Sequence, residues 1–397
     1  MKNSRIVFFQ VTGLMIVTVA GAGFASGREI SLFFFGQSLW GYAGMVLSML
    51  LLVGAAAWGM QTGIHSGRKN LGDAVRAEAG RGWGAVTSWV ADSFTFMIFC
   101  VMLAGMAETL SQVTGWPGRI CLLIFACICG AILLGNLSGM LKFSLFAAPL
   151  MIAGMAAACL FVMRKLPQGS LPVQLQFSGG AELFSREVRD WLSRSGWLLA
   201  ALLYASYNAI PLAAVMCETS PVIRDLASKR KILLGALASG AAVLLLLAVL
   251  MLTMLRYIPD MAGLPMPVVH ALKQAAVRVG GDPGGRLAQT GYAVVLLAAM
   301  LTTALSAGLC LVSRLDRLLE CISTASSHER WTASAVMLCA CSIPFAGAGF
   351  MNLVAAVYPL YGVLGCLYFA GSVLQRFLHR MHRMRRMHRM RRMRHVP

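Results

Sequence analysis

The sequence predicts an all-α, polytopic membrane protein with about ten transmembrane helices, arranged as a five-plus-five inverted repeat in which helices 1 and 6 are broken. Of its 397 residues, 58% are hydrophobic and 12% are charged, whereas soluble domains are about half apolar and a quarter charged. The apolar residues occur in runs of about twenty, the length that crosses a hydrocarbon layer of about 30 Å. This composition excludes a soluble globular enzyme.

Ten apolar runs, each bounded by charged residues, glycine or proline, are the predicted spans. Helices are the only open-chain structures that satisfy backbone polar groups in lipid, and the alternating pattern of a membrane β-barrel is absent. The runs cover residues 6–36, 39–61, 84–111, 117–135, 140–163, 194–217, 232–255, 288–312, 331–346 and 350–374. Most of the eleven cysteines lie inside these runs without a Cys-x-x-Cys pair, which indicates packing residues rather than a zinc site or a disulfide framework.

A long connection divides the chain into two halves. Residues 164–193 separate the first five spans, within residues 1–163, from the second five, within 194–375. An odd number of spans per half places the halves in opposite orientations across the membrane, which is the plan of many secondary transporters. Two short helices are also predicted: an interfacial one at residues 185–194 and an amphipathic one at 268–279.

Charge predicts the orientation. With the N-terminus inside, about two thirds of the 34 Lys and Arg residues lie on the inner side, as the positive-inside rule expects. We therefore expect an integral protein of the cytoplasmic (plasma) membrane with both termini in the cytoplasm. The basic tail at 376–397 has a like-charge pattern typical of disorder and of attraction to anionic lipid. It lacks the interleaved aromatic residues of a nucleic-acid site, so no nucleic-acid partner is predicted.

The first span is predicted to be broken by glycine. Residues 21–27 read Gly-Ala-Gly-Phe-Ala-Ser-Gly, and each glycine costs a helix about 1 kcal/mol relative to alanine. An unwound segment at membrane depth needs a ligand, an ion or water to satisfy its backbone, and the half-helix that follows would direct its positive end at an anion. Close helix packing through Gly23 and Gly27 is the alternative.

Spans six and eight carry polar residues at corresponding depth. In span six, Pro211 removes the hydrogen bond to the carbonyl of Tyr207, beside Asn208, and the alternative is an ordinary proline kink. In span eight, Thr302 and Thr303 form a cluster of hard oxygen ligands that suits a small cation. Threonines in membrane helices also bond to their own i−4 carbonyl, which is the competing interpretation.

Charged residues inside spans are functional candidates by default. Arg28 and Glu29 follow the glycine segment directly, which suggests a gating or proton-linked role. Asp92 in span three is interpreted either as a proton carrier or as a partner for another helix. Glu108 lies near the outer end of the same span, where water reaches it.

The segment Gly-Phe-Ala-Ser-Gly at residues 23–27 also raises the possibility of an intramembrane serine protease. A serine nucleophile needs a base within hydrogen-bond reach, and none of the seven histidines lies in a span. The sequence therefore predicts no catalytic residue and no enzyme.

The stretch from Val19 to Phe35, with Ala-Gly-Ala-Gly-Phe-Ala-Ser-Gly-Arg-Glu-Ile before a Phe-rich run, resembles the YkvI-like membrane proteins. These belong to the amino acid–polyamine–organocation superfamily, whose members share the LeuT-type fold. The resemblance covers about residues 5–375. It implies that the amides of Gly21, Ala22 and Gly23 hold a substrate carboxylate. The predicted substrate-binding residues are Gly21, Ala22, Gly23, Phe24, Ser26, Gly27, Tyr204, Tyr207 and Asn208.

The same resemblance implies a sodium site between helices one and eight. Its ligands would be the carbonyls of Val17, Ala20 and Ala299 and the hydroxyls of Thr302 and Thr303. Proton-coupled relatives place a lysine of helix five at this position. Here Lys142 lies only at the inner end of span five, which favours sodium.

These observations predict a secondary active transporter for a small amino-acid-like solute, coupled to sodium or, as a second choice, to protons, and working by alternating access. Its partners would be the solute, the coupling ion and membrane lipid, with no cofactor and no metal beyond sodium. The alternative is a non-transporting membrane sensor or assembly partner with a transporter-like fold. A channel ranks third because broken helices suit alternating access better.

Overall fold

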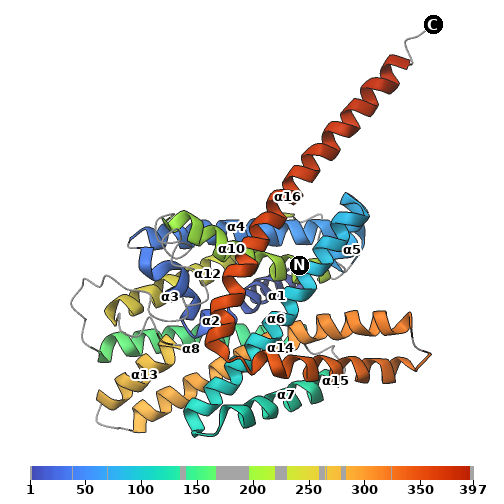
Figure 1. Ribbon diagram of the computed structural model, residues 1–397. Coiled ribbons are helices and arrows are strands. Elements are labelled where there is room, and N and C mark those ends of the chain that lie inside the picture. Colours follow the sequence, from blue (N-terminus) through green and yellow to red (C-terminus); the bar gives the residue numbers. More distant parts are fainter. Residues whose placement is uncertain are drawn as a thin grey trace.

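The computed structural model of the protein is a bundle of helices (Figure 1). No strand occurs in the part of the chain that the structure describes. That part comprises residues 2–37, 39–68, 70–134, 140–166, 196–219, 230–258, 264, 266–278, 283–322 and 324–393. The predicted interfacial helix at 185–194 lies outside it. The prediction of an all-α protein is confirmed.

Each of the ten predicted spans contains a helix. The first half of the chain forms α1 (Lys2–Val19), α2 (Ala22–Ala25), α3 (Arg28–Phe34), the 3₁₀ helix η1 (Phe35–Gln37), α4 (Trp40–Ser66), α5 (Leu71–Ala79), α6 (Arg81–Thr114), α7 (Gly118–Leu134) and α8 (Met140–Lys165). The second half forms α10 (Gly196–Glu218), α12 (Arg230–Tyr257), α13 (Pro267–Arg278), α14 (Pro283–Glu320), α15 (Ser327–Ala346) and α16 (Phe350–Met393).

The lengths of these helices agree with a membrane protein. Seven of the described helices are long and apolar enough to cross a bilayer, namely α4, α6, α8, α10, α12, α14 and α16, and α1 and α7 are shorter apolar helices. The amphipathic helix predicted at 268–279 is α13. The sequence analysis missed α5, a nine-residue helix that begins where the Asn70 side chain accepts a hydrogen bond from the Asp73 N–H at 3.2 Å.

The two halves pack in matching ways. Helix α1 packs on α12 and on α8, and α10 correspondingly packs on α4 and on α16. Likewise α6 contacts α7 and α16, while α14 contacts α15 and α8. Exchanging each span with the one five places along the chain converts one set of contacts into the other, which is the pattern a five-plus-five repeat produces. The boundaries at 163 and 194 stay a prediction.

Span six is not broken, contrary to the sequence-based prediction. Helix α10 runs continuously from Gly196 to Glu218 with Pro211 inside it. A membrane helix tolerates a proline where neighbouring helices and polar side chains satisfy the freed groups, and α10 is packed between α4 and α16. Within the same helix, the Asn208 amide donates a hydrogen bond to the Tyr204 carbonyl at 3.2 Å.

The basic tail continues α16 instead of breaking away from it. The helix extends to Met393, well outside the bundle (Figure 1). Arginine and methionine are strong helix formers, so like charge does not prevent helix formation here.

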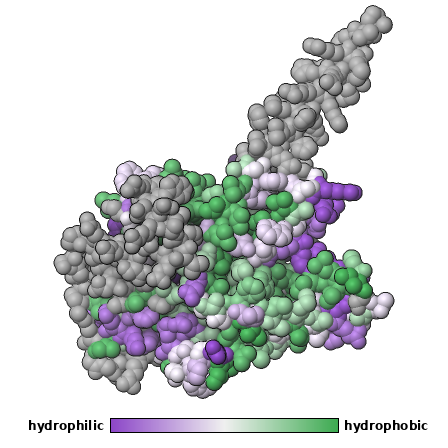
Figure 2. Space-filling model, in the orientation of Figure 1, coloured by the Kyte–Doolittle hydropathy of each residue, from purple (hydrophilic) through white to green (hydrophobic). Residues whose placement is uncertain are grey.

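The bundle exposes apolar side chains over a wide face (Figure 2). Among the large ones, Leu50, Trp89 and Leu246 are 66%, 67% and 69% exposed. Soluble proteins seldom expose contiguous apolar surface on this scale, and a hydrocarbon environment accounts for it.

Helices α4 and α10 approach each other at Gly59. A Cβ atom added to Gly59 would lie 2.6 Å from the Cα and 2.8 Å from the carbonyl carbon of Ala213. Backbone atoms cannot move aside as a flexible side chain can, so only glycine fits. Nearer the N-terminus of α4, the Ser48 hydroxyl donates a hydrogen bond to the Ala201 carbonyl of α10 at 3.1 Å.

We predict that Gly59→Ala lowers the free energy of unfolding by about 1–3 kcal/mol, because the methyl group overpacks the contact. The matched control is Gly54→Ala in the same helix, where a Cβ meets nothing within 4 Å and alanine should gain about 0.5–1 kcal/mol. Unfolding in detergent measures both variants. Equal stability of the two would contradict the close approach of α4 and α10.

Candidate functional site

The first span is broken at the predicted place. Helix α1 ends at Val19, and the Gly21 N–H donates to the Val19 carbonyl at 2.9 Å instead of to the carbonyl of Val17 four residues back. Val17 therefore loses the hydrogen bond that a continuous helix would supply. The helix resumes as the single turn α2 and then as α3, so the first span consists of α1 and two short helices.

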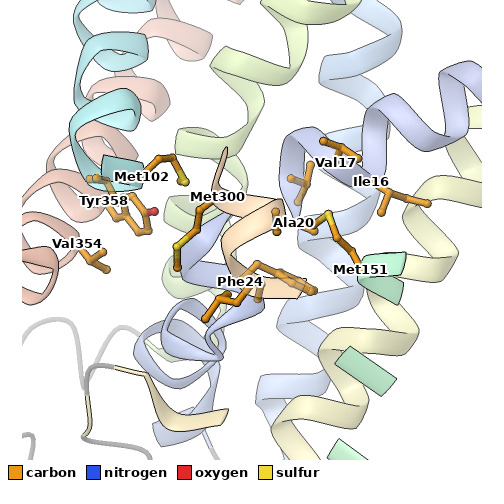
Figure 3. Close-up of a cluster of buried hydrophobic side chains, with 14 of the residues drawn as sticks. Ile16, Val17, Ala20, Phe24, Met102, Met151, Met300, Val354 and Tyr358 are labelled. Atoms are coloured by element: carbon orange, nitrogen blue, oxygen red, sulfur yellow. The ribbon is translucent and has the colours of Figure 1, made fainter. Parts of the chain in front are cut away.

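The break is enclosed by three other helices. A Cβ on Gly21 would lie 3.2 Å from the Cε of Met102 in α6 and 3.9 Å from the Cγ2 of Thr303 in α14. In Figure 3, Met300 lies between Ala20 and Phe24 of the broken span on one side and Met102 of α6 and Tyr358 of α16 on the other. The segment is thus buried in protein, the condition under which irregular backbone is stable at membrane depth.

The predicted sodium ligands of span eight lie against this break. The hydroxyls of Thr302 and Thr303 both donate to the Ala299 carbonyl, at 2.8 and 3.0 Å, as the competing interpretation of the sequence describes. Their oxygen lone pairs are not used by these bonds. The Thr303 methyl carbon would lie 3.9 Å from a Cβ on Gly21, so this part of α14 neighbours the broken span. Ion binding there stays a prediction.

Glu29 is the most unusual residue of the site. It is only 3% exposed, and its side chain folds back over Gly23, so that its Cγ and Cδ would lie 2.7 and 2.8 Å from a Cβ on that glycine. Gly23 is therefore needed to make room for Glu29. At Gly23 the neighbour is thus the Glu29 side chain of the same span, and not another helix as the packing alternative expected.

Tyrosines face the Glu29 carboxyl. The hydroxyls of Tyr207 in α10 and Tyr358 in α16 point toward it, but their geometry leaves Glu29 Oε2 and the Tyr207 hydroxyl without a hydrogen-bond partner among the described residues. The Tyr204 hydroxyl is likewise unpartnered there. Sequence analysis missed Tyr358, since a tyrosine in an apolar run carries no signal of what it faces.

These residues belong to an aromatic cluster. Tyr207 stacks on Tyr358 with ring centroids 4.8 Å apart, lies edge-on to Tyr204 at 5.5 Å and stacks on Phe33 of α3 at 5.6 Å. We call Phe33, Tyr204, Tyr207 and Tyr358 the aromatic cluster. All four side chains are buried, so the site is closed to solvent in this conformation.

Three other predicted residues have local roles. The Ser26 hydroxyl donates to the Gly23 carbonyl at 3.2 Å and accepts from the Arg28 N–H at 3.4 Å, while Asn208 bonds within α10. Arg28 is buried at the start of α3. Helix α3 has only seven residues, so it provides a short dipole at most.

Asp92 lies away from the break and pairs with another helix. Its carboxylate forms a two-pronged ion pair with Arg314 of α14, with N–O distances of 2.9 and 3.0 Å. Ten residues of α6, about 15 Å of helix, separate Asp92 from Met102 at the break. Of the two interpretations of Asp92, the structure shows the helix-to-helix partner.

Helix α13 covers the C-terminal end of the glycine segment. The Val268 N–H donates to the Ser26 carbonyl at 3.1 Å, and a Cβ on Gly27 would lie 2.9 Å from the Val268 Cγ2. Gly27 also has φ +80°, a conformation that glycine adopts without strain. On a further side, the Tyr292 hydroxyl of α14 donates to the Ala25 carbonyl.

Comparisons with known proteins agree with this architecture. No family model matches the chain. The membrane protein YkvI of Bacillus subtilis (strain 168) is 24% identical over 382 residues, which cover 94% of this chain and 97% of YkvI. The chain is thus similar to YkvI over nearly its whole length, and its fold is the LeuT-type fold.

Two solved structures share the fold. MhsT in complex with L-phenylalanine superposes with a TM-score of 0.59 at 17% identity, covering 90% of this chain and 87% of MhsT. A manganese transporter of Eremococcus coleocola gives a TM-score of 0.61 at 15% identity, covering 93% and 78%. These likenesses show that the chain has the fold of MhsT and of the manganese transporter.

We predict that Gly27→Ala lowers the stability of the protein by more than its strained backbone alone would. The positive φ costs an alanine about 1–2 kcal/mol, and contact with Val268 adds about 1–3 kcal/mol of overpacking. Gly115→Ala isolates the first cost, because Gly115 has φ +77° with nothing within 4 Å of its Cβ position. Thermal unfolding compares the two variants, and equal losses would contradict the contact between α13 and the glycine segment.

Proposed function

We propose that this protein is a secondary active transporter that moves a small amino-acid-like solute by alternating access, coupled to sodium. The observation that carries this proposal is the break in the first span, which lies inside the bundle beside α14. Unsatisfied backbone at this depth is characteristic of substrate and ion sites in transporters of this type.

The coupling ion is proposed from the oxygen atoms around the break. The carbonyls of Val17 and Ala20, with the hydroxyls of Thr302 and Thr303, supply the hard ligands that a small alkali cation prefers. In the present conformation the Ala299 carbonyl accepts hydrogen bonds from both hydroxyls. Ala299 can therefore bind the ion only if the threonine side chains rotate or if α1 and α14 shift. Protons remain the second choice of coupling ion.

An organic solute is favoured over a divalent metal. Among the residues that the structure describes, no group of three or more His, Cys, Asp and Glu side chains is placed to hold a metal ion. The buried aromatic cluster instead offers apolar surface with a few polar groups, the usual composition of a small-molecule site. That MhsT is complexed with L-phenylalanine adds support for an amino-acid-like solute.

The orientation and location are proposed from charge. We place both termini in the cytoplasm and the protein in the plasma membrane, with lipid as its remaining partner, because basic residues cluster on that side and in the tail.

In the double variant Thr302→Ala with Thr303→Ala, sodium should no longer stimulate uptake at the concentrations that stimulate the wild type. The half-saturating sodium concentration should rise by at least about tenfold. Uptake of a panel of labelled amino acids into proteoliposomes, with sodium or potassium outside, measures the effect. Thr95→Ala is the control, since the Thr95 hydroxyl also bonds to its own i−4 carbonyl, at 2.6 Å, but belongs to α6 away from the break. Unchanged sodium dependence in the double variant would refute the sodium site.

A further inference from the structure

Glu29 has polar contacts that the sodium site does not explain. Its Oε2 atom and the hydroxyls of Tyr204 and Tyr207 are buried and lack hydrogen-bond partners in the described part of the chain. Buried polar groups in proteins are nearly always paired, and leaving one unpaired costs about 1–3 kcal/mol. Because three such atoms lie close together, we infer that another group forms hydrogen bonds with them in a different step of the transport cycle.

Charge limits what that group can be. An ionised carboxylate in the membrane interior is stable only with a counter-charge. Among the residues that the structure describes, the titratable groups that face Glu29 are the hydroxyls of Tyr204 and Tyr207 from α10 and of Tyr358 from α16, all neutral donors. Arg28 precedes Glu29 in α3, and consecutive residues of a helix do not face each other. Glu29 must therefore carry a proton here and exchange it for a cation when it ionises.

The surroundings select an organic cation. The rings of Tyr207 and Tyr358, whose hydroxyls point toward the carboxyl, stack on each other, and Tyr207 also stacks on Phe33. Aromatic faces attract ammonium groups by about 0.5–2 kcal/mol each. The tyrosine hydroxyls keep acceptor lone pairs for N–H donors. A carboxylate combined with aromatic rings is a site for an amine.

We propose that Glu29 binds the ammonium group of the transported solute and releases a proton when it does so. The protonated carboxyl gives its proton to water, and the solute's R–NH₃⁺ takes its place, so that the net charge of the site is unchanged. This inference rests on the proposed function and refines it: the solute must carry an amine, and its carboxylate is dispensable.

The proposal conflicts with one implication of the family resemblance. The amides of Gly21, Ala22 and Gly23 were expected to hold a substrate carboxylate, but the Glu29 side chain already covers Gly23. A second carboxylate beside it would meet a like charge. An amino acid can bind only with its ammonium group toward Glu29 and its carboxylate turned away, toward Gly21 and the sodium site.

Three probes with one carbon skeleton test this assignment. They are 2-phenylethylamine, which is only an ammonium, L-phenylalanine, which is a zwitterion, and 3-phenylpropionate, which is only a carboxylate. We expect the first two to raise the thermal unfolding temperature of the purified protein and the third to leave it unchanged. Because the amine competes with a proton, its affinity should weaken by up to about tenfold per pH unit as the pH falls.

Variants assign the effect to Glu29. Glu29→Gln keeps the shape of the neutral side chain, so the protein should fold, but the response to 2-phenylethylamine and its pH dependence should be lost. Glu108→Gln is the control, because Glu108 only accepts a hydrogen bond from Gln112 at 2.9 Å within α6. It should respond like the wild type. A response retained in Glu29→Gln, or a response to 3-phenylpropionate equal to that of the amine, would overturn the proposal.

Infrared spectroscopy observes the proton on Glu29 directly. The difference between the wild type and Glu29→Gln should contain the C=O stretch of a protonated carboxylic acid, and 2-phenylethylamine should remove it. A missing band, or a band that the amine leaves unchanged, would refute the exchange. Neither result depends on sodium-driven uptake, so failure here and failure of the transport proposal are separately visible.

Discussion

The backbone between Val19 and Ala22 must satisfy its polar groups without a helix, inside a bundle that excludes water. This constraint explains why so many different elements converge on a few residues. Helix α6 contributes Met102, α14 contributes Thr303, and α13 bonds to the Ser26 carbonyl. An unwound segment that was exposed to lipid would cost several kcal/mol for each unsatisfied group, so the break and its enclosure depend on each other.

The same constraint explains the position of Glu29. Its side chain fills the space above Gly23 and so closes a region that the interrupted helix would otherwise leave open. Burying a carboxyl in this way is unfavourable unless it is neutral or paired. The closed site is therefore destabilised by its unpartnered hydroxyls and by its buried acid. A ligand that pairs with both can shift the protein toward a different conformation.

Local sequence signals predicted much of this fold. Apolar runs predicted the helices of all ten spans, because each helix that crosses lipid must itself be long and hydrophobic. An amphipathic pattern predicted α13. Three glycines in seven residues gave the break in the first span. The continuity of α10 through Pro211 was not predictable, since the helices that support it come from elsewhere in the chain. The partner of Asp92 and the position of Tyr358 likewise depend on contacts over more than 200 residues.

The most direct test of the central claim, that the broken span is an incomplete ligand site, is thermal unfolding of the purified protein in matched sodium and potassium buffers across a panel of amino acids and amines. A ligand that binds the folded state stabilises it by about 2.7 kcal/mol at a hundredfold excess over Kd. The account predicts a rise in unfolding temperature that is specific to sodium and is enlarged by an amine-bearing solute. If no combination of ion and solute raises the unfolding temperature, the claim is wrong.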